Sequence, residues 1–249
     1  MTAFTNKLWF SLLHKRPYKG IEPNYPNVSS IKGIHELEAN YEIVLTELQN
    51  YLKQYVFEPQ FNITMVEKPK SWKVRSLRVW SVEMYEIQKH FPITIKLLSN
   101  IDGVINVGFN LLEPQASIKP HCGDTNAIIR CHLGLIVPKE DDTCAIKVNG
   151  EIKHWQQGKV IGFTDAYDHE AWNKTDQQRI IMLFDILKPE YMTQKNKICG
   201  VVLASLYMQN LGNVFPKLYN VNPVWLYPIS YPLSFIIRFL IPIRNYLKK

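Results

Sequence analysis

The sequence is poor in cysteine, and its cysteines show no pairing pattern. Four occur among 249 residues, at Cys122, Cys131, Cys144 and Cys199. None belongs to a C-x-x-C pair, and together they do not make a dense disulfide framework. This scarcity argues against a disulfide-stabilised scaffold and favours a protein of a reducing compartment.

The chain also lacks targeting and low-complexity signals. Its first twenty residues, MTAFTNKLWFSLLHKRPYKG, hold a short apolar run with most of the basic residues after it and no small-residue cleavage site. We therefore expect no signal peptide and a cytoplasmic protein. The composition, 46% hydrophobic and 20% charged, excludes a disordered chain, and we find no internal repeat.

Acidic residues are missing from residues 191–249. This segment holds seven basic residues, which are Lys195, Lys197, Lys217, Arg238, Arg244, Lys248 and Lys249. The other 22 of the 29 basic residues are balanced by the 22 acidic ones, so the segment carries the whole net charge of +7. Because its cations alternate with aliphatic residues and prolines, we expect no nucleic-acid partner.

The same segment ends in a long apolar run. Residues 224–241 are about long enough to span a bilayer, but Pro228 and Pro232 would break a helix there, and Arg238 lies within it. Two alternatives stay open: residues 220–249 contact the inner face of a membrane peripherally, or they pack on the protein's own core. The first is favoured by aromatic residues among the aliphatics and cations, at Trp225, Tyr227, Tyr231, Phe235, Phe239 and Tyr246.

Hydrophobic spacing divides the rest of the chain into a helical part and a β-rich part. Residues 36–56 predict an amphipathic helix, and further helices are expected near residues 83–90 and after Pro92. From residue 104 the pattern changes to short strands between Asn-Gly, Pro and Gly, which favours a jelly roll over βαβ units. The expected strand segments are 103–114, 126–138, 144–155, 159–165 and 179–187, with a hairpin turn at Asn149-Gly150.

We expect an N-terminal helical portion (1–60) packed on the core, a jelly-roll domain (61–190) and an apolar, basic C-terminal extension (191–249).

Two segments place polar side chains in apolar strands. In residues 119–138, KPHCGDTNAIIRCHLGLIVP, strand alternation puts Arg130 and His132 on one face. In residues 163–187, His169 precedes a strand in which Arg179 and Asp185 share a face. Imidazoles suit a metal such as iron or zinc, and a buried guanidinium needs an anion. The combination indicates a metal site that also holds an anionic co-substrate.

Three motifs, in this order and spacing, resemble the aspartyl/asparaginyl β-hydroxylase family. They are P-H-x-G-x-T-N at 120–126, R-x-H-L-G-L at 130–135 and D-H-E-x-W at 168–172, with a later arginine at 179. The resemblance covers roughly residues 72–190. It implies a double-stranded β-helix of the jelly-roll or cupin-like kind. It also implies an Fe(II)- and 2-oxoglutarate-dependent dioxygenase that uses O₂ to hydroxylate an unactivated C–H bond.

The resemblance implies a ligand set by position. His121 and His169 would bind the iron. Gly123 stands where most enzymes of this chemistry carry a third, carboxylate ligand, and the family commonly lacks that ligand, which leaves a coordination position for water. Arg179 would bind the distal carboxylate of 2-oxoglutarate.

Four further residues receive roles from the same comparison. Arg130 and His132 would donate to the other carboxylate of the co-substrate or to an acidic group of the substrate. Asn110 stands where some members have a serine that helps to hold 2-oxoglutarate. Asp165 is a candidate substrate contact.

The family name suggests β-hydroxylation of Asp or Asn residues in a peptide or protein. Peptide-active members can carry an arginine at the position of Ile128, and its absence leaves hydroxylation of a membrane-lipid acyl chain as the main alternative. An alternative of another class is a non-catalytic metal-binding cupin module holding zinc with His121, His132 and His169. Taken singly, each histidine could be structural, and the two arginines could form ion pairs with Asp165, Asp185 or Glu170.

Overall fold

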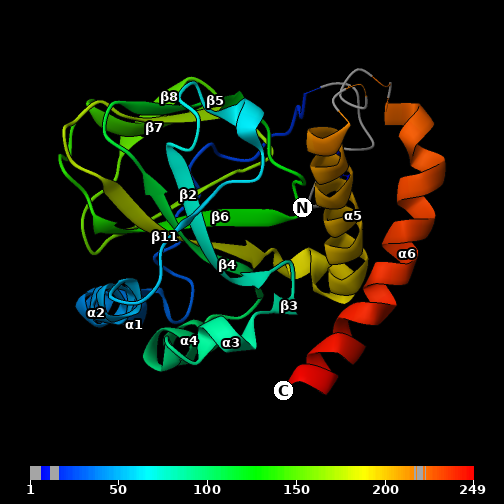
Figure 1. Ribbon diagram of the computed structural model, residues 1–249, viewed down its shortest axis with the longest axis horizontal. Coiled ribbons are helices and arrows are strands. Elements are labelled where there is room, and N and C mark those ends of the chain that lie inside the picture. The colour runs from blue at the N-terminus through cyan, green and yellow to red at the C-terminus, as the bar shows by residue number, and fades with distance from the viewer. Residues whose placement is uncertain (1–6, 12–16, 216, 218–220, 222) are drawn as a thin grey trace, which may run out of the picture.

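The computed structural model of the protein describes residues 7–11, 17–215, 217, 221 and 223–249, with the backbone alone for 223–227. Two antiparallel sheets face each other at its centre (Figure 1). The larger sheet has the order β1-β2-β4-β11-β6-β9, with β3 paired to β2, and the smaller has the order β5-β10-β7-β8. Every strand pair is antiparallel, so the jelly roll is confirmed.

The strands are β1 (Glu58–Pro59), β2 (Trp72–Val79), β3 (Val82–Glu83), β4 (Val104–Leu112), β5 (Ala116–His121), β6 (Ile128–Ile136), β7 (Cys144–Val148), β8 (Glu151–His154), β9 (Val160–Phe163), β10 (His169–Asn173) and β11 (Arg179–Leu187). The helices are α1 (Ile34–Ala39), α2 (Tyr41–Leu52), α3 (Tyr85–Gln88), α4 (Pro92–Ser99), α5 (Lys195–Val214) and α6 (Pro223–Lys248). The 3-10 segments are η2 (Ile63–Met65) and η3 (Pro189–Gln194).

Alternation along β11 explains why the site lies between the sheets. Met182 and Phe184 belong to the core cluster under the helices, whereas Ile181 belongs to the cluster between the sheets. Arg179, Ile181 and Leu183 therefore share the inner face, where they line a cavity, as the sequence predicts. Helices α1, α2 and α4 contribute to the first cluster and cover the outer face of the larger sheet (Figure 1).

All five expected strand segments form strands, and the Asn149-Gly150 turn joins β7 to β8. Positive φ angles of 48° and 86° at these two residues fit a tight hairpin turn. Strands β2, β5 and β10 were not among the expected ones. Strand β5, ASIKPH, does alternate apolar with polar residues, but it is only six residues long, and Pro120 within it argues against a strand.

Three helical segments differ from the expectation. The helix expected over 36–56 is two helices, α1 and α2, because the backbone leaves the helical region at Asn40. Helix α5 was not predicted. Helix α6 continues through Pro228, Pro232 and Pro242, so the prediction that prolines would break it is wrong. All three prolines are exposed, where solvent can satisfy the carbonyl groups that they leave unbonded.

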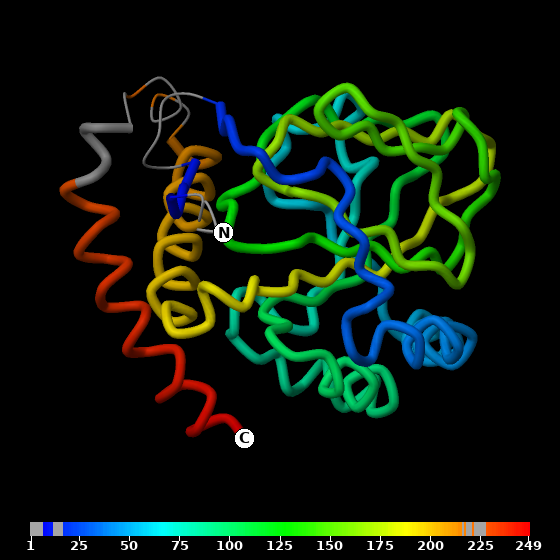
Figure 2. Tube along the Cα trace, turned by 180° about the vertical axis from the view of Figure 1, so that it is seen from behind, coloured from blue at the N-terminus to red at the C-terminus, as the bar shows by residue number. Residues whose placement is uncertain are grey.

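The N-terminal segment closes one edge of the two-sheet core. Seen from behind, it runs from the α5 side across the sheets to α1 (Figure 2). Backbone and side-chain hydrogen bonds fix it: the Thr164 amide donates to Asn24 O at 3.0 Å, and the Tyr25 hydroxyl donates to Ile146 O at 3.1 Å. This strap is thus tied to the end of β9 in the larger sheet and to β7 in the smaller sheet.

Candidate active site

His121 and His169 lie side by side on neighbouring strands. They are register partners in β5 and β10, and their ring centroids are 4.2 Å apart. The Nδ1 atom of His121 is 2.7 Å from Lys119 O, and that of His169 is 2.9 Å from Tyr167 O. Because a carbonyl only accepts, both Nδ1 atoms carry the proton, and both Nε2 lone pairs are left for a ligand. Burial lowers the pKa of both rings, most strongly for His169, which favours the neutral, metal-binding form.

Arg179 is a buried cation without a carboxylate partner among the described residues. Its side chain is 2% exposed, and its Nε atom makes no hydrogen bond. Its Cζ atom lies 4.5 Å from the ring centroid of Trp155. Burial lowers the pKa of Arg179 to about 10, so the group is still charged at neutral pH. An unpaired buried charge is costly, and a carboxylate ligand would compensate for it.

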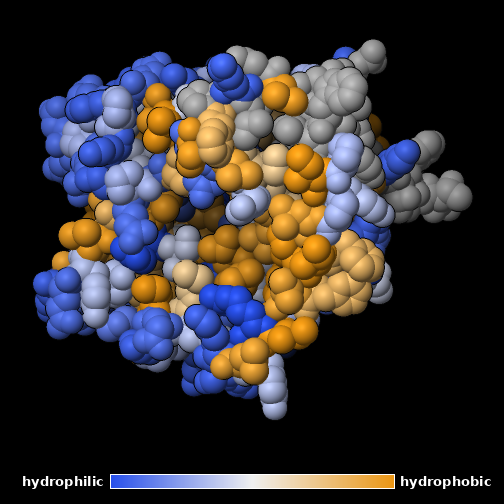
Figure 3. Space-filling model, turned by 45° about the vertical axis from the view of Figure 1, so that its right-hand side comes forward, coloured by the Kyte–Doolittle hydropathy of each residue, from blue (hydrophilic) through white to orange (hydrophobic). Residues whose placement is uncertain are grey.

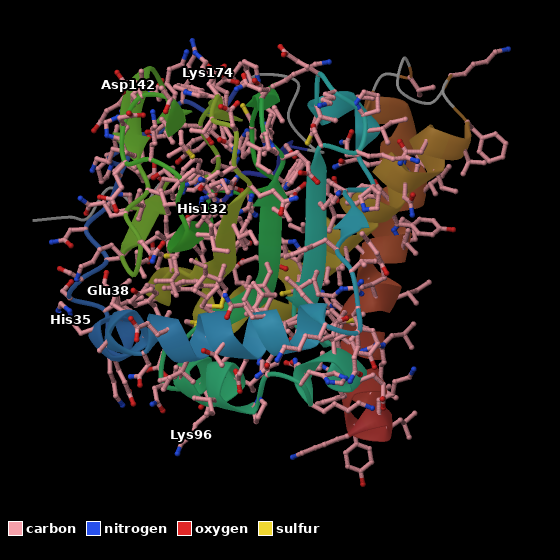
Figure 4. The ribbon with its side chains drawn as sticks, turned by 60° about the vertical axis from the view of Figure 1, so that its left-hand side comes forward. His35, Glu38, Lys96, His132, Asp142 and Lys174 are labelled. Carbon is pink, nitrogen blue, oxygen red and sulfur yellow. The ribbon has the colours of Figure 1, made fainter. Side chains whose placement is uncertain are left out.

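His132 supplies a second unused donor beside Arg179. The Trp155 indole donates to His132 Nδ1 at 3.3 Å, so in a neutral ring the proton is on Nε2. The Nε2 atom is buried and has no partner. Burial is the main cause that lowers the pKa of His132 well below its ordinary value, and the Arg179 charge adds to it. Figure 4 shows His132 in the interior between the sheets, in contrast to His35 at the surface.

Arg130, unlike Arg179, is held by two carboxylates. Its Nη1 lies 2.6 Å from Asp165 Oδ1, and its Nε and Nη2 donate to the Asp185 carboxylate at 2.7 and 2.9 Å. Burial alone would lower the pKa of Arg130, but the two carboxylates outweigh it and raise the pKa. The alternative of a structural ion pair thus describes Arg130 and not Arg179. A role for Arg130 in holding 2-oxoglutarate stays a prediction.

Asp165 occupies the space beside the histidine pair that a side chain at position 123 would need. A Cβ atom added to Gly123 would lie 1.7 Å from Asp165 Oδ2. The Gly123 amide donates to Asp165 O at 2.8 Å, and Asp165 Oδ1 is 3.6 Å from His169 Nε2. Asp165 is fully buried and lines neither of the cavities described below, which fits a supporting position better than direct contact with a substrate.

Two cavities meet at His121. The inner one, of about 50 Å³, lies between the sheets and is lined by both histidines of the pair, His132 and Arg179. The outer one is a cleft of about 400 Å³ that extends from His121 and Gly123 to Leu206 and Gln209 of α5. His121, Arg130 and Asn110 line both. Asn110 Oδ1 accepts a hydrogen bond from the Trp72 indole at 2.9 Å, which leaves the Asn110 amide N–H as a donor for a ligand.

Two ideas from the sequence can be compared with these positions. Ile128 is fully buried in the cluster beneath α5 and lines neither cavity, and what its identity says about the substrate stays a prediction. The three-histidine zinc site does not form: no group of three or more His, Cys, Asp or Glu side chains arranged for a metal occurs in the part of the chain that the structure describes. All four cysteines lie in that part and are free, as expected.

The sequence did not point to two contributors to the site. Trp155 follows β8, and no motif marks it as a site residue. It is fully buried and contacts both Arg179 and His132. Leu206 and Gln209 enter the outer cleft from a helix that was not predicted at all. No local pattern marks these roles, because they depend on which elements pack together.

The residues present fit a metal with an anionic co-substrate. Two neutral imidazoles offer adjacent lone pairs, and an unpaired arginine with a free imidazole N–H lies deeper in the same cavity. With the two-sheet core, this arrangement defines a jelly-roll protein of the oxygenase kind.

Comparison with known proteins identifies the family. The model of the aspartyl/asparaginyl beta-hydroxylase family matches residues 38–189, well over half of the chain. The ornithine lipid ester-linked acyl 2-hydroxylase of Rhizobium tropici is 32% identical over 196 residues, which are 76% of this chain and 70% of that protein. Human aspartyl/asparaginyl beta-hydroxylase is 36% identical over 91 residues, which are 36% of this chain and 12% of the human protein. Among solved structures, a Pseudomonas putida prolyl-4-hydroxylase aligns with a TM-score of 0.43 and 12% identity over 65% of this chain and 95% of its own.

The chain belongs to the aspartyl/asparaginyl β-hydroxylase family. It is an enzyme, a hydroxylase of the dioxygenase class, as the motifs predicted.

Proposed function

We propose that the enzyme depends on Fe(II) and 2-oxoglutarate and hydroxylates the acyl chain of a membrane lipid. The observation that carries the cofactor assignment is the unpaired Arg179 beside the free His132 Nε2. Together these groups suit one carboxylate, which Arg179 would bind through a charged, forked donor pair. His121 and His169 would hold Fe(II) through their Nε2 atoms, at the point where the inner cavity meets the outer cleft.

In this proposal each protein group has one task. The carbonyl groups of residues 119 and 167 keep both metal-binding rings in the right tautomer and orientation. Trp155 stacks on Arg179 and fixes the tautomer of His132. When bound, iron with 2-oxoglutarate and O₂ supplies the oxidising power, and one oxygen atom enters the C–H bond while succinate and CO₂ form. The mixed apolar and polar walls of the outer cleft would hold the substrate.

Two observations support a lipid substrate. The relative from Rhizobium tropici, named an acyl 2-hydroxylase, matches 76% of the chain, whereas the human β-hydroxylase matches 36%. The outer cleft has apolar side chains from several elements, namely Phe61, Met65, Trp80 and Leu206. These side chains would suit the hydrocarbon next to the reacting carbon.

Hydroxylation of Asp or Asn in a peptide is the second candidate. The 36% identity to the human enzyme supports it, and so do amide side chains in the cleft, at Gln60, Asn62, Asn106 and Gln209.

The test offers both substrate classes to the same enzyme. The purified chain, supplied with Fe(II), ascorbate and 2-oxoglutarate, is incubated with ester-linked acyl lipids in mixed micelles and, separately, with Asp- and Asn-containing peptides. We expect the lipid to gain one oxygen atom by mass spectrometry, with an equal amount of succinate. Oxygen gained by a peptide alone would refute the lipid assignment and establish the second candidate.

A further inference from the structure

Helix α6 presents an entirely apolar face to the outside. From Pro228 to Leu247, every exposed side chain is aliphatic, aromatic or proline. The large hydrophobic ones at half exposure or more are Ile229, Tyr231, Phe235, Ile236, Phe239, Leu240, Ile243, Tyr246 and Leu247. The side chains of Trp225 and Tyr227 lie outside those that the structure describes. Figure 3 shows apolar residues gathered over this side of the molecule, while the opposite part of the view is mostly hydrophilic.

Four polar residues of α6 face the protein instead. Ser230 and Ser234 are buried, at 2% and 7% exposure. Asn245 Nδ2 donates to Ser81 O at 2.7 Å, and Arg244 Nη1 donates to Glu83 O at 2.8 Å. A helix on a water-exposed surface has the reverse arrangement, with its apolar stripe turned inward. The outward face of α6 is therefore suited to an apolar environment.

The inner face of α6 is already occupied by α5. A Cβ atom on Gly200 of α5 would lie 2.6 Å from Ser234 O, so the two helices are in close backbone contact there. Ile241 of α6 belongs to the core cluster shared with α5. A small residue at a close crossing is a feature of helices that pack in an apolar medium.

The positive charge around α6 indicates which kind of apolar surface its outward face would bind. Residues 191–249 contain seven basic residues and no acidic one, and Lys248 and Lys249 are exposed at the end of α6. Arg238 lies against the exposed rings of Phe235 and Phe239, at 4.4 and 4.8 Å from their centroids. Two copies of so basic a segment would repel each other, whereas anionic lipid headgroups would attract it.

We propose that the outward face of α6 docks the enzyme on an anionic membrane surface. The apolar side chains enter the boundary between headgroups and acyl chains, and the lysines at the end of the helix bind the headgroups. Because α5 carries α6 on one side and contributes Leu206 and Gln209 to the outer cleft, docking brings the cleft close to the lipid surface. This last consequence rests on the proposed lipid substrate, whereas the docking itself does not.

The test is flotation of the intact chain with vesicles. Vesicles of phosphatidylcholine alone are compared with vesicles that also contain phosphatidylglycerol. The variant Ile236→Gln/Phe239→Gln/Ile243→Gln changes three outward side chains of α6. A matched control, Ile21→Gln/Val56→Gln/Ile152→Gln, changes three exposed apolar side chains elsewhere.

We expect the wild type to bind the anionic vesicles at least about tenfold more tightly than the neutral ones, and less tightly at high salt. The α6 variant should lose at least about tenfold in binding, and the control should bind like the wild type. Absence of wild-type binding would overturn the proposal, and so would an equal loss in the control. A dimer that dissociates in the α6 variant, without vesicle binding, would show that a second copy covers this face and would also overturn it.

The substrate assay separates failure of this proposal from failure of the proposed function. Vesicle binding together with hydroxylation of peptides alone would leave the docking face standing and remove the lipid substrate. Hydroxylation of a micellar lipid without vesicle binding would support the lipid substrate and overturn the docking face.

Discussion

Arg130 and Arg179 differ in what balances their charge. Arg130 has two carboxylates within hydrogen-bond distance, whereas Arg179 has an aromatic ring on one side and a cavity on the other. The unpaired charge of Arg179 therefore lowers the stability of the folded protein until an anion binds. Such a cost is characteristic of a binding site rather than of a structural ion pair.

We predict that Arg179→Met raises the stability of the protein without co-substrate and abolishes its response to 2-oxoglutarate. Removing an uncompensated charge should add about 1–4 kcal/mol to the free energy of unfolding. Arg130→Met is the matched control. It should lower that free energy by about 3–5 kcal/mol, because Asp165 and Asp185 would stay buried without their partner.

Thermal unfolding with and without 2-oxoglutarate measures both effects. The wild type should gain stability with the co-substrate and the Arg179 variant should not. A wild-type response to 2-oxoglutarate in Arg179→Met would mean that another group binds the anion.

The three interior histidines make stability depend on pH. Burial lowers the pKa values of His121, His132 and His169 in the folded protein. Below about pH 6.5 the unfolded chain binds protons that the folded chain does not. Stability is therefore fully present above that pH and falls as the pH decreases, by about 1.4 kcal/mol per pH unit for each histidine that stays neutral.

We predict that His132→Gln makes the free energy of unfolding depend less steeply on pH, by about 1.4 kcal/mol per pH unit, which is the contribution of one histidine that stays neutral. Urea unfolding of the metal-free protein between pH 7.5 and 5.5 measures it, with the surface variant His35→Gln as control. Burial raises the pKa of Asp124 to about 6, although the charge of Arg130 opposes this shift. Asp124 therefore adds stability as the pH falls, whereas the histidines remove it. The difference between the two variants is the quantity to compare, because Asp124 is the same in both. Equal pH slopes in the two variants would contradict the prediction.

At the residue scale, the sequence predicted which side chains come together but not how each is held. Motif order was enough to pick out His121, His169 and Arg179, and they line one cavity. The partners of Arg130 are 35 and 55 residues away along the chain, and strand pairing alone decides that both reach it. The same is true of Trp155, because nothing in its neighbourhood marks it as the group beneath Arg179.

At the scale of elements, the pairing of α5 with α6 depends on one glycine. We predict that Gly200→Val separates the helices, because the new side chain would collide with the backbone at Ser234. The free energy of unfolding should fall by about 1–3 kcal/mol. Hydrogen exchange in α6 should become faster, while 2-oxoglutarate binding should not change, since neither helix contributes to the inner cavity. Asn210→Val, at an exposed position of α5, is the control, and equal exchange rates in the two variants would refute the prediction.

Element prediction succeeded where the hydrophobic period is regular and failed where tertiary contacts override local preference. Strands β4, β6 and β11 carry long apolar runs, and all were expected. Strand β10 is only five residues long and holds His169, Glu170 and Asn173, so it shows little strand signal of its own. It is formed by pairing with β5 on one side and β7 on the other.

For the molecule as a whole, the site lies where three parts of the chain meet. The larger sheet supplies Arg179 and His132, the smaller sheet supplies the histidine pair, and α5 closes the outer cleft. Among the described residues, no helix is both long and apolar enough to cross a membrane. The sequence predicted the jelly roll and an apolar, basic extension, but not that the extension forms one wall of the cleft. That wall follows from the packing of α5 against the core cluster of Ile105, Ile128 and Leu187.

The proposed function requires that His121 and His169 hold the iron of a 2-oxoglutarate-dependent hydroxylase. The most direct measurement is succinate formation from 2-oxoglutarate with and without added Fe(II), in the wild type, His169→Ala and the surface control His35→Ala. We predict iron-dependent succinate in the wild type and the control, and a loss of at least about a hundredfold in His169→Ala. Iron-dependent turnover that survives in His169→Ala, or its absence from the wild type together with no binding of 2-oxoglutarate, would contradict the account.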